Sequence, residues 1–285
     1  MIKLKGKYTS SKEADKKVEQ DLKIVNEIIV RRLNPVSILL FGGFGRGEGS
    51  FQKIKGKILP LNDYDMYAIT KHDVSEKEIE ETGIECSEAI GRGGGEFVSN
   101  YLDTYDRNKY FHVDLRYIKY SELGKQRRIN RTYELKHGSL VIYGEDVRKR
   151  INDISVPLSE SFRYLINPAC HLLLTMDSRR LKGDFKEDEK FYIIHHIIKA
   201  YLAIASSMII SSGSFKESYT STNEEFQKLY KKKFSLLAAR VQEATELKKA
   251  ARKEFSVKDI RKRWMQARDD LYFSLDYISR KHLDI

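Results

Sequence analysis

The hydrophobic pattern at the start of the chain predicts a helix followed by a short buried strand. Residues 11–33 carry apolar side chains at the spacing of one helix face. Asn34 and Pro35 follow, and the residue before a proline disfavours the helical conformation, so the helix should stop there. Residues 36–41 then form a continuous apolar run, rich in leucine and β-branched residues, which is typical of a buried strand.

Two later segments alternate between polar and apolar residues, and both predict strands that carry carboxylates. In residues 63–69, alternation places Asp63 and Asp65 on the same face. In residues 111–118, His112, Asp114 and Arg116 share the polar face, and the residues on either side of Asp114 are apolar. Each strand therefore presents acidic side chains on one face and packs the other.

The remaining pattern up to about residue 155 is mixed. A glycine-rich break at 91–95 reads more readily as a linker than as a phosphate-binding loop, because no helix signal follows it. The other predicted elements are helices at 75–90, 121–129 and 145–151, strands at 97–102 and 139–143, and a hairpin or extended loop at 52–61.

From about Ser159 onward the pattern is helical throughout, with a boundary near Val156 and Pro157. We expect an α/β (α+β) domain over residues 1–155, with a mixed central sheet and flanking helices, followed by an all-α helical bundle over residues 156–285. The predicted helices of the bundle span 159–182, 188–212, 222–250 and 257–280.

Composition adds a preference for anionic partners. The 285 residues are 41% hydrophobic, enough for a packed core, and carry a net charge of +11. That charge suits nucleotides, nucleic acid or an acidic membrane surface, and equally a soluble basic protein. The two cysteines lack metal-ligand spacing, and the first residues lack the apolar stretch of a signal peptide. The apolar stretch Phe191–Ile210 is interrupted by polar residues and reads as a buried helix, so we expect a cytoplasmic protein without a membrane partner.

A glycine-dense loop, residues 42–50, follows the first predicted strand directly. Gly42 and Gly43 allow a ligand to approach the backbone closely, and Arg46 offers a fork of donors for phosphate. The loop lacks the Gly-Lys-Ser/Thr of a P-loop, and its glycine spacing differs from the dinucleotide-binding fingerprint. By itself such a loop is more often an ordinary turn.

The carboxylates suggest a metal site. Asp63 and Asp65 stand two residues apart on one strand face, about 6.6 Å between α-carbons, so their side chains can converge on divalent ions. Asp114 on a neighbouring strand could complete the set, and carboxylate oxygens suit Mg²⁺. Taken alone, the two aspartates would more often be a solvated strand face; the glycine loop beside them makes the combination specific.

This combination resembles the polymerase-β-like nucleotidyltransferase superfamily. The matching residues are Phe41-Gly42-Gly43, the Arg46-Gly47-Glu48 run, the acidic pair Asp63 and Asp65, and Asp114 between apolar neighbours. Arg46-Gly47-Glu48 is similar to the run in minimal and kanamycin-type members, and the helical second half resembles the bundles that accompany them. The resemblance implies that Asp63, Asp65 and Asp114 bind two Mg²⁺ ions, and that the backbone of Gly42 and Gly43 holds the triphosphate. With Arg46 and Ser50 of the same loop, these glycines are the predicted NTP-binding residues.

The implied reaction is Mg²⁺-dependent transfer of an NMP, with ATP the expected donor, to an acceptor hydroxyl. The acceptor stays open between a small molecule, an RNA 3′ end and a protein side chain. A non-catalytic nucleotide- or RNA-binding module is the alternative, although three retained carboxylates argue against it. A homodimer is also open, because kanamycin-type enzymes are dimers.

Two features depart from the family pattern or match it weakly. The interval between Gly43 and Asp63 is longer than in minimal members, and its lysines suggest a basic hairpin that contacts the acceptor or, equally, a solvated loop. Glu145 occupies a place that resembles that of a general base in kanamycin-type enzymes, but capping of the helix predicted at 145–151 would explain it as well.

Two features of the helical half have a functional and a packing explanation. The basic segment 248–268, with Phe255 and Trp264 interleaved, could contact nucleic acid, but a solvated helix face is the more frequent explanation. His195 and His196 lie mid-helix among apolar residues and are predicted to pack in the core.

Overall fold

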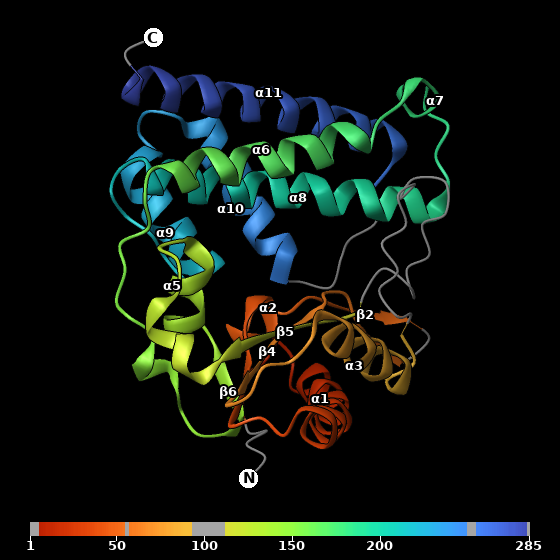
Figure 1. Ribbon diagram of the computed structural model, residues 1–285. Helices are drawn as coiled ribbons and strands as arrows, with labels where there is room; N and C mark the ends of the chain where they lie inside the picture. Colours follow the sequence, from red (N-terminus) through yellow and green to blue (C-terminus); the bar gives the residue numbers. More distant parts are fainter. Residues whose placement is uncertain (1–5, 55–56, 93–111, 250–254, 284–285) are drawn as a thin grey trace. The chain divides into compact units, whose positions relative to one another are not determined.

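The structure, a computed structural model, describes residues 6–54, 57–92, 112–249 and 255–283 (Figure 1). The chain forms two compact units. The first contains the described residues up to Ser155, and the second runs from Val156 to Lys248 and continues with the described residues from Phe255 onward. The strand predicted at 97–102, and most of the predicted glycine-rich break, lie outside the described residues.

The first helix, α1 (Lys12–Leu33), confirms the predicted element. Ser11 caps it by accepting a hydrogen bond from the Ala14 N–H, which satisfies one of the helix's unpaired first-turn donors. Asn34 ends it in the left-handed conformation, with φ of 41°. The apolar stripe that predicted the helix is buried against the sheet described next.

A four-stranded sheet forms the centre of the first unit, in the order β5-β4-β1-β6. β1 runs antiparallel to both of its neighbours, and β4 and β5 are parallel. The strands are β1 (Ser37–Leu40), β4 (Tyr64–Thr70), β5 (Val113–Lys119) and β6 (Leu140–Gly144).

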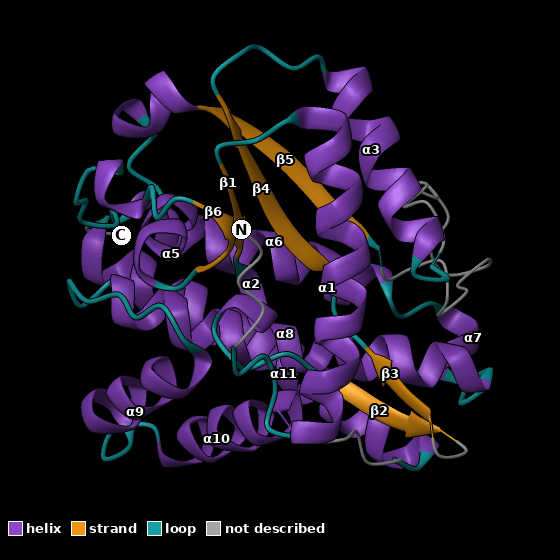
Figure 2. Cartoon of the chain, turned by 90° about the horizontal axis from the view of Figure 1, so that it is seen from below, coloured by secondary structure: helices purple, strands orange, loops and turns teal. Residues whose placement is uncertain are grey.

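Each face of the sheet has its own core. α1 and α3 (Glu76–Ala89) lie side by side on one face, where they bury Tyr64, Met66 and Ala68 of β4 (Figure 2). The intervening residues Tyr67 and Ile69 pack into the second core, on the opposite face. This alternation is the one that the sequence predicts, and it leaves Asp65 on the face of Tyr67.

Several short elements differ from their predictions. The helix predicted at 121–129 is a 3₁₀ helix, η1 (Tyr120–Lys125), that ends early because Gln126 is extended. The helix α5 (Asn130–His137) was not predicted, and only Arg148–Arg150, the 3₁₀ helix η2, is helical within 145–151. The 52–61 region is a hairpin of β2 (Phe51–Ile54) and β3 (Lys57–Pro60), as the sequence suggests.

The second unit is built around α8 (Glu187–Ile210). This helix is apolar and long enough to span a membrane by length and composition, but 94% of its most apolar window is buried within the protein, which confirms the predicted buried helix. The other helices of the unit are α6 (Ser159–Leu174), α7 (Ser178–Leu181), α9 (Tyr219–Tyr230), α10 (Ser235–Lys249) and α11 (Val257–His282).

Two of the long helices predicted in this unit are in fact broken. The segment 159–182 divides because the Asp177 side chain accepts the Arg180 N–H and caps a new helix, α7. The segment 222–250 divides between α9 and α10, where Phe234 N–H still bonds to the Tyr230 carbonyl in a tight turn. Apolar periodicity continues across both breaks, so the sequence pattern did not reveal them.

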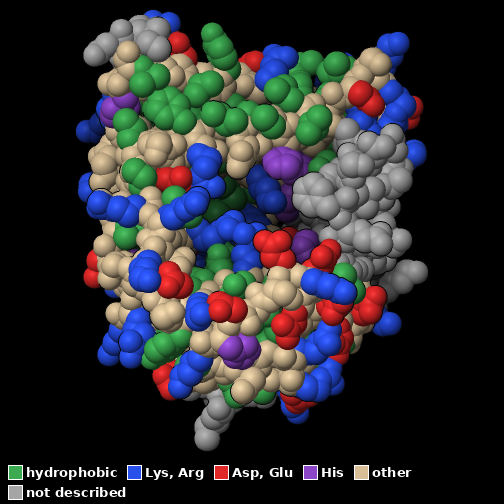
Figure 3. Space-filling model, viewed as in Figure 1, with side chains coloured by type: hydrophobic (Ala, Val, Ile, Leu, Met, Phe, Trp, Pro, Cys, Tyr) green, Lys and Arg blue, Asp and Glu red, His purple; other side chains and the backbone are tan. Residues whose placement is uncertain are grey.

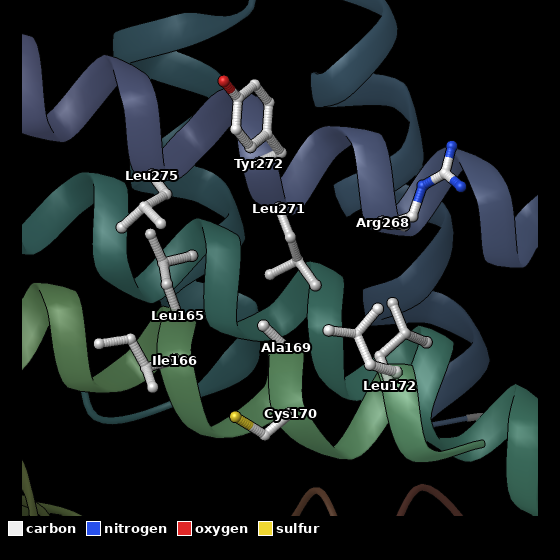
Figure 4. Close-up of a pocket in the computed structure, with 10 residues that line it drawn as sticks. Leu165, Ile166, Ala169, Cys170, Leu172, Arg268, Leu271, Tyr272 and Leu275 are labelled. Atoms are coloured by element: carbon white, nitrogen blue, oxygen red, sulfur yellow. The ribbon is translucent and has the colours of Figure 1, made fainter. Parts of the chain in front are cut away.

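α6 and α11 border an apolar groove of about 300 Å³ (Figure 4). Leu165, Leu271 and Leu275 point into it, and Cys170 lies on its α6 side. Hydrophobic side chains also gather on the surface over α11 and α6 (Figure 3), among them the exposed Leu173 and Tyr272.

Candidate active site

The glycine loop begins as one short helical turn, α2 (Gly42–Gly45), at the end of β1. Gly42 has φ of 65°, a conformation that suits glycine. A Cβ at Gly42 would collide with Oδ2 of Asp65, so any larger residue would force that carboxylate to move. The Phe41 N–H donates to the Asp65 carbonyl at 3.0 Å, which joins the start of the loop to β4.

Asp65 and Asp114 stand directly opposite each other on adjacent strands. β4 and β5 are parallel, and the register pairs Asp65 with Asp114. Neighbouring strands lie about 4.8 Å apart, and paired residues of a parallel ladder project to the same side, so the two carboxylates share one face of the sheet. Both residues are partly exposed, as groups that meet a ligand must be.

Asp63 precedes β4 and lies close to His112, which precedes β5. The Asp63 Oδ1 atom accepts the His112 backbone N–H at 3.0 Å and lies 3.5 Å from the His112 Nδ1 atom. The carboxylate therefore fixes the entry of both strands, and about a third of its side chain remains exposed. The structure places Asp63 at the same edge of the sheet as Asp65 and Asp114, with one oxygen engaged.

Arg116 lies at this edge of the sheet too, although it is not among the site residues that the sequence predicts. Its Nη2 donates to the Asp114 Oδ2 at 2.9 Å, and its Nε lies 3.2 and 3.3 Å from the two carboxylate oxygens. Burial alone would lower the pKa of the Arg116 guanidinium, but the hydrogen bonds and charge of Asp114, with a smaller contribution from Asp65, raise it. Alternation had placed Arg116 on the face of Asp114, and this was the available signal.

Arg46, predicted to bind phosphate, is buried in an ion-pair cluster. Its Nη1 lies 3.2 Å from a Glu134 oxygen and its Nε 3.9 Å from Glu48, and only 5% of the side chain is exposed. Glu134 reaches the loop from α5, the helix that the sequence did not predict. Arg46 therefore ties the loop to the rest of the unit, and its role in holding a nucleotide stays a prediction.

Ser50 closes the far end of the glycine loop. Its N–H donates to the Asn62 Oδ1 at 2.9 Å, and its carbonyl accepts the Leu61 N–H at 2.8 Å. The residue is fully buried. It secures the base of the β2–β3 hairpin just ahead of Asp63, and its predicted role in nucleotide binding also stays a prediction.

The donor chemistry of the site fits a magnesium ion held by two protein carboxylates. Mg²⁺ is commonly bound by one or two carboxylates, with waters and substrate phosphates completing its shell. Asp65 and Asp114 supply such a pair. Among the described residues no group of three or more acidic, histidine or cysteine side chains is arranged to hold a metal, so the two-ion, three-carboxylate arrangement stays a prediction.

Glu145 lies away from these carboxylates. Its N–H donates to the Val36 carbonyl at the start of β1, whereas Asp65 lies beside Phe41, which follows the end of that strand. Five residues of extended chain, about 16 Å, separate the two ends. The structure therefore does not support Glu145 as a general base at this site.

The hairpin is a surface ribbon of the first unit. Lys53 forms an exposed ion pair with Glu13 of α1, with its Nζ 3.0 Å from the carboxylate, and Lys57 is exposed. Lys55 lies outside the described residues. Contact with an acceptor stays a prediction for this hairpin.

The aromatic residues of the basic segment belong to the core of the second unit. Trp264 is 6% exposed, and its indole N–H donates to the Leu172 carbonyl at 2.9 Å. Arg263 pairs with Glu243 and lies over the Phe255 ring. These contacts favour packing over a nucleic-acid interface, and buried His195 and His196 likewise match the predicted core position.

Comparison with known proteins shows the fold. No protein-family model matches the chain, and no curated protein does so either. The structure is similar to the crystal structure of spectinomycin adenyltransferase AAD(9) from Enterococcus faecialis with ATP and spectinomycin, with a TM-score of 0.50 and 13% sequence identity. The match covers 89% of this chain and 98% of that one. The expected fold, a mixed sheet with flanking helices followed by a helical region, is therefore confirmed as one that this chain shares with that adenyltransferase.

Proposed function

From this nucleotidyltransferase fold, we propose that the protein transfers AMP from ATP to a hydroxyl group of a small molecule. The observation that carries the proposal is the pairing of Asp65 with Asp114 on adjacent strands, directly beside the glycine loop. The similar structure was solved with ATP and with spectinomycin, which supports ATP as donor and a small molecule as acceptor.

In the proposed reaction, the acceptor oxygen attacks the α-phosphorus of ATP, and the bond to the pyrophosphate leaving group breaks. The acceptor's proton passes to solvent. A bound Mg²⁺ would neutralise phosphate charge and favour the deprotonated acceptor. Asp65 and Asp114 would hold the ion, and the backbone at Gly42 and Gly43 would position the triphosphate. Positioning and charge complementarity then account for most of the rate enhancement.

We also propose a role for each of the two parts of the chain. Residues 1–155 would form the catalytic domain, because all the site residues discussed above fall within them. Residues 156–285 would form the accompanying helical domain. We also propose a cytoplasmic location, where ATP and Mg²⁺ are both available.

The direct test is incubation with Mg²⁺ and each α-³²P-labelled NTP, together with a metabolite extract or total RNA. We expect label from ATP to enter small molecules, with release of pyrophosphate. Label in RNA or on the chain itself would replace the proposed acceptor by nucleic acid or protein. Tight NTP binding without turnover in any mixture would instead indicate a binding module.

A matched pair of variants ties the activity to the site. Asp65→Asn should lower turnover by on the order of 10³-fold while the thermal midpoint barely changes. Asp73→Asn is the control, because Asp73 lies just beyond β4 and forms an exposed ion pair with Lys119. Equal effects of the two substitutions would contradict the assignment.

A further inference from the structure

Two residues of one strand form a charged clamp at the carboxylate edge of the sheet. Arg116 and Asp114 stand two apart on β5, and the guanidinium reaches both oxygens of Asp114 through three contacts of 2.9 to 3.3 Å. Such two-point pairing of arginine with carboxylate is among the stronger charge-assisted interactions in proteins. The oxygens that would bind a metal ion are thus already engaged.

The charge balance of the site depends on this contact. Asp65 and Asp114 are two negative groups side by side, and Arg116 is the cation that is hydrogen-bonded to one of them. Lys119, farther along β5, is directed to Asp73 instead, at 2.8 Å. A divalent ion that bound to Asp114 would bring further positive charge close to the guanidinium, and like charges at short range repel.

Both side chains of the clamp are partly exposed to solvent. The Arg116 side chain is 39% exposed and that of Asp114 is 29% exposed. A partly exposed arginine can exchange one anion for another without a large desolvation cost, and its planar fork matches phosphate as well as carboxylate.

We propose that Arg116 is a built-in counter-ion that competes with the divalent ion for Asp114 and turns to the triphosphate when the nucleotide binds. This inference rests on the proposed function. Metal alone would bind weakly, because it must displace the guanidinium. The nucleotide offers Arg116 another anion, frees Asp114 and so tightens metal binding. By thermodynamic linkage, the metal tightens nucleotide binding by the same factor.

The test is equilibrium binding of Mn²⁺, followed by the electron paramagnetic resonance signal of the free ion, with and without a non-hydrolysable ATP analogue. We expect Arg116→Gln to bind Mn²⁺ alone about tenfold more tightly than the wild type, within the usual range of coupled sites. The analogue should tighten Mn²⁺ binding strongly in the wild type and much less in the variant. Arg116→Lys keeps the charge without the fork and should fall between the two.

Lys119→Gln is the matched control, since it removes one positive charge from the same strand without touching Asp114. Unchanged or weaker Mn²⁺ binding by Arg116→Gln, with its thermal midpoint preserved, would overturn the inference. An equal gain in Lys119→Gln would also overturn it, because the effect would then be one of general charge. The binding measurement needs no turnover, so it can be made on an inactive protein. Altered metal coupling without transferase activity would refute the proposed function but not the counter-ion role.

Discussion

The carboxylate of Asp65 fills the space into which a side chain at Gly42 would project. Oδ2 of Asp65 would lie far inside van der Waals contact of a Cβ at that position. The loop is proposed to hold the triphosphate, and the strand is proposed to hold the metal. These two segments can approach each other this closely because residue 42 has no side chain.

Substitution of Gly42 should disturb the contact between the glycine loop and Asp65. We expect Gly42→Ala to lower turnover by about 10²-fold, because the methyl group must displace Asp65. It should also lower the free energy of unfolding by roughly 1–2 kcal/mol, through the strained positive φ and the collision. Steady-state kinetics and urea denaturation measure the two effects.

Gly213→Ala is the control for backbone strain alone. Gly213 has φ of 80°, and a Cβ there would meet no described atom within 4 Å. It should share the loss of stability but not the loss of turnover. Full activity in Gly42→Ala would contradict the close fit between the loop and Asp65.

The buried cluster around Arg46 predicts a loss of stability on removal of Glu134. Glu134→Gln leaves the Arg46 guanidinium, 5% exposed, with the more distant Glu48 as its acidic neighbour in this cluster. We expect the free energy of unfolding to fall by on the order of 3 kcal/mol. Glu122→Gln, which breaks an exposed pair with Lys125, should cost less than about 1 kcal/mol in the same urea titration. Similar costs for both would show that burial does not matter here.

Glu189 should make the second unit sensitive to acid. Burial would raise its pKa, but hydrogen bonds from Arg180, Arg179 and the Lys186 N–H bring it down from 4.5 to about 2. A lowered pKa in the folded state means that this stabilisation is present above pH 4.5 and is lost as the pH falls toward 2.

Glu189→Gln should therefore destabilise the protein most at neutral pH. We expect a loss on the order of 3 kcal/mol at pH 7, because Arg180 is 1% exposed, and a smaller difference from the wild type at pH 3. Asp276→Asn, at an exposed pair with Arg280, is the control and should change stability little at either pH. A difference that does not vary with pH would exclude the ion pair as its cause.

The two cysteines should differ in reactivity. Cys86 is fully buried, and burial raises the pKa of its thiol to about 12, whereas Cys170 is exposed on α6. At pH 8 we expect the native protein to react with one equivalent of a thiol reagent and the unfolded protein with two. Cys170→Ser should abolish the native reaction. Rapid reaction of both thiols in the folded protein would contradict the burial of Cys86.

The sequence predicted those parts of the fold in which one strong periodic pattern decides the outcome. The first helix, the strands of the sheet and the carboxylates Asp65 and Asp114 all follow from such patterns. Helix breaks near Asp177 and at 231–234 escaped prediction, because apolar periodicity continues across them and local capping decides where the chain turns.

The site was predicted in its residue types more than in its contacts. Alternation put Arg116 on the face of Asp114, but whether a guanidinium faces its neighbour, solvent or a ligand depends on the packing around it. The Arg46–Glu134 ion pair could not be predicted for another reason. It joins the loop to α5, and this helix is too weakly amphipathic for the sequence pattern to indicate it.

The burial of α8 has a consequence for how the chain is made. Within Phe191–Ile210, every residue except Lys199 is buried, so the helix has no outward face. During synthesis, α8 is complete before α11, which packs against it, has been translated. A helix that is meant to be buried on all sides associates with other chains when it is exposed to water. Folding of the second unit should therefore depend on chaperones that cover α8 until α11 has been synthesised and has packed against it. Chains that are truncated before α11 should aggregate.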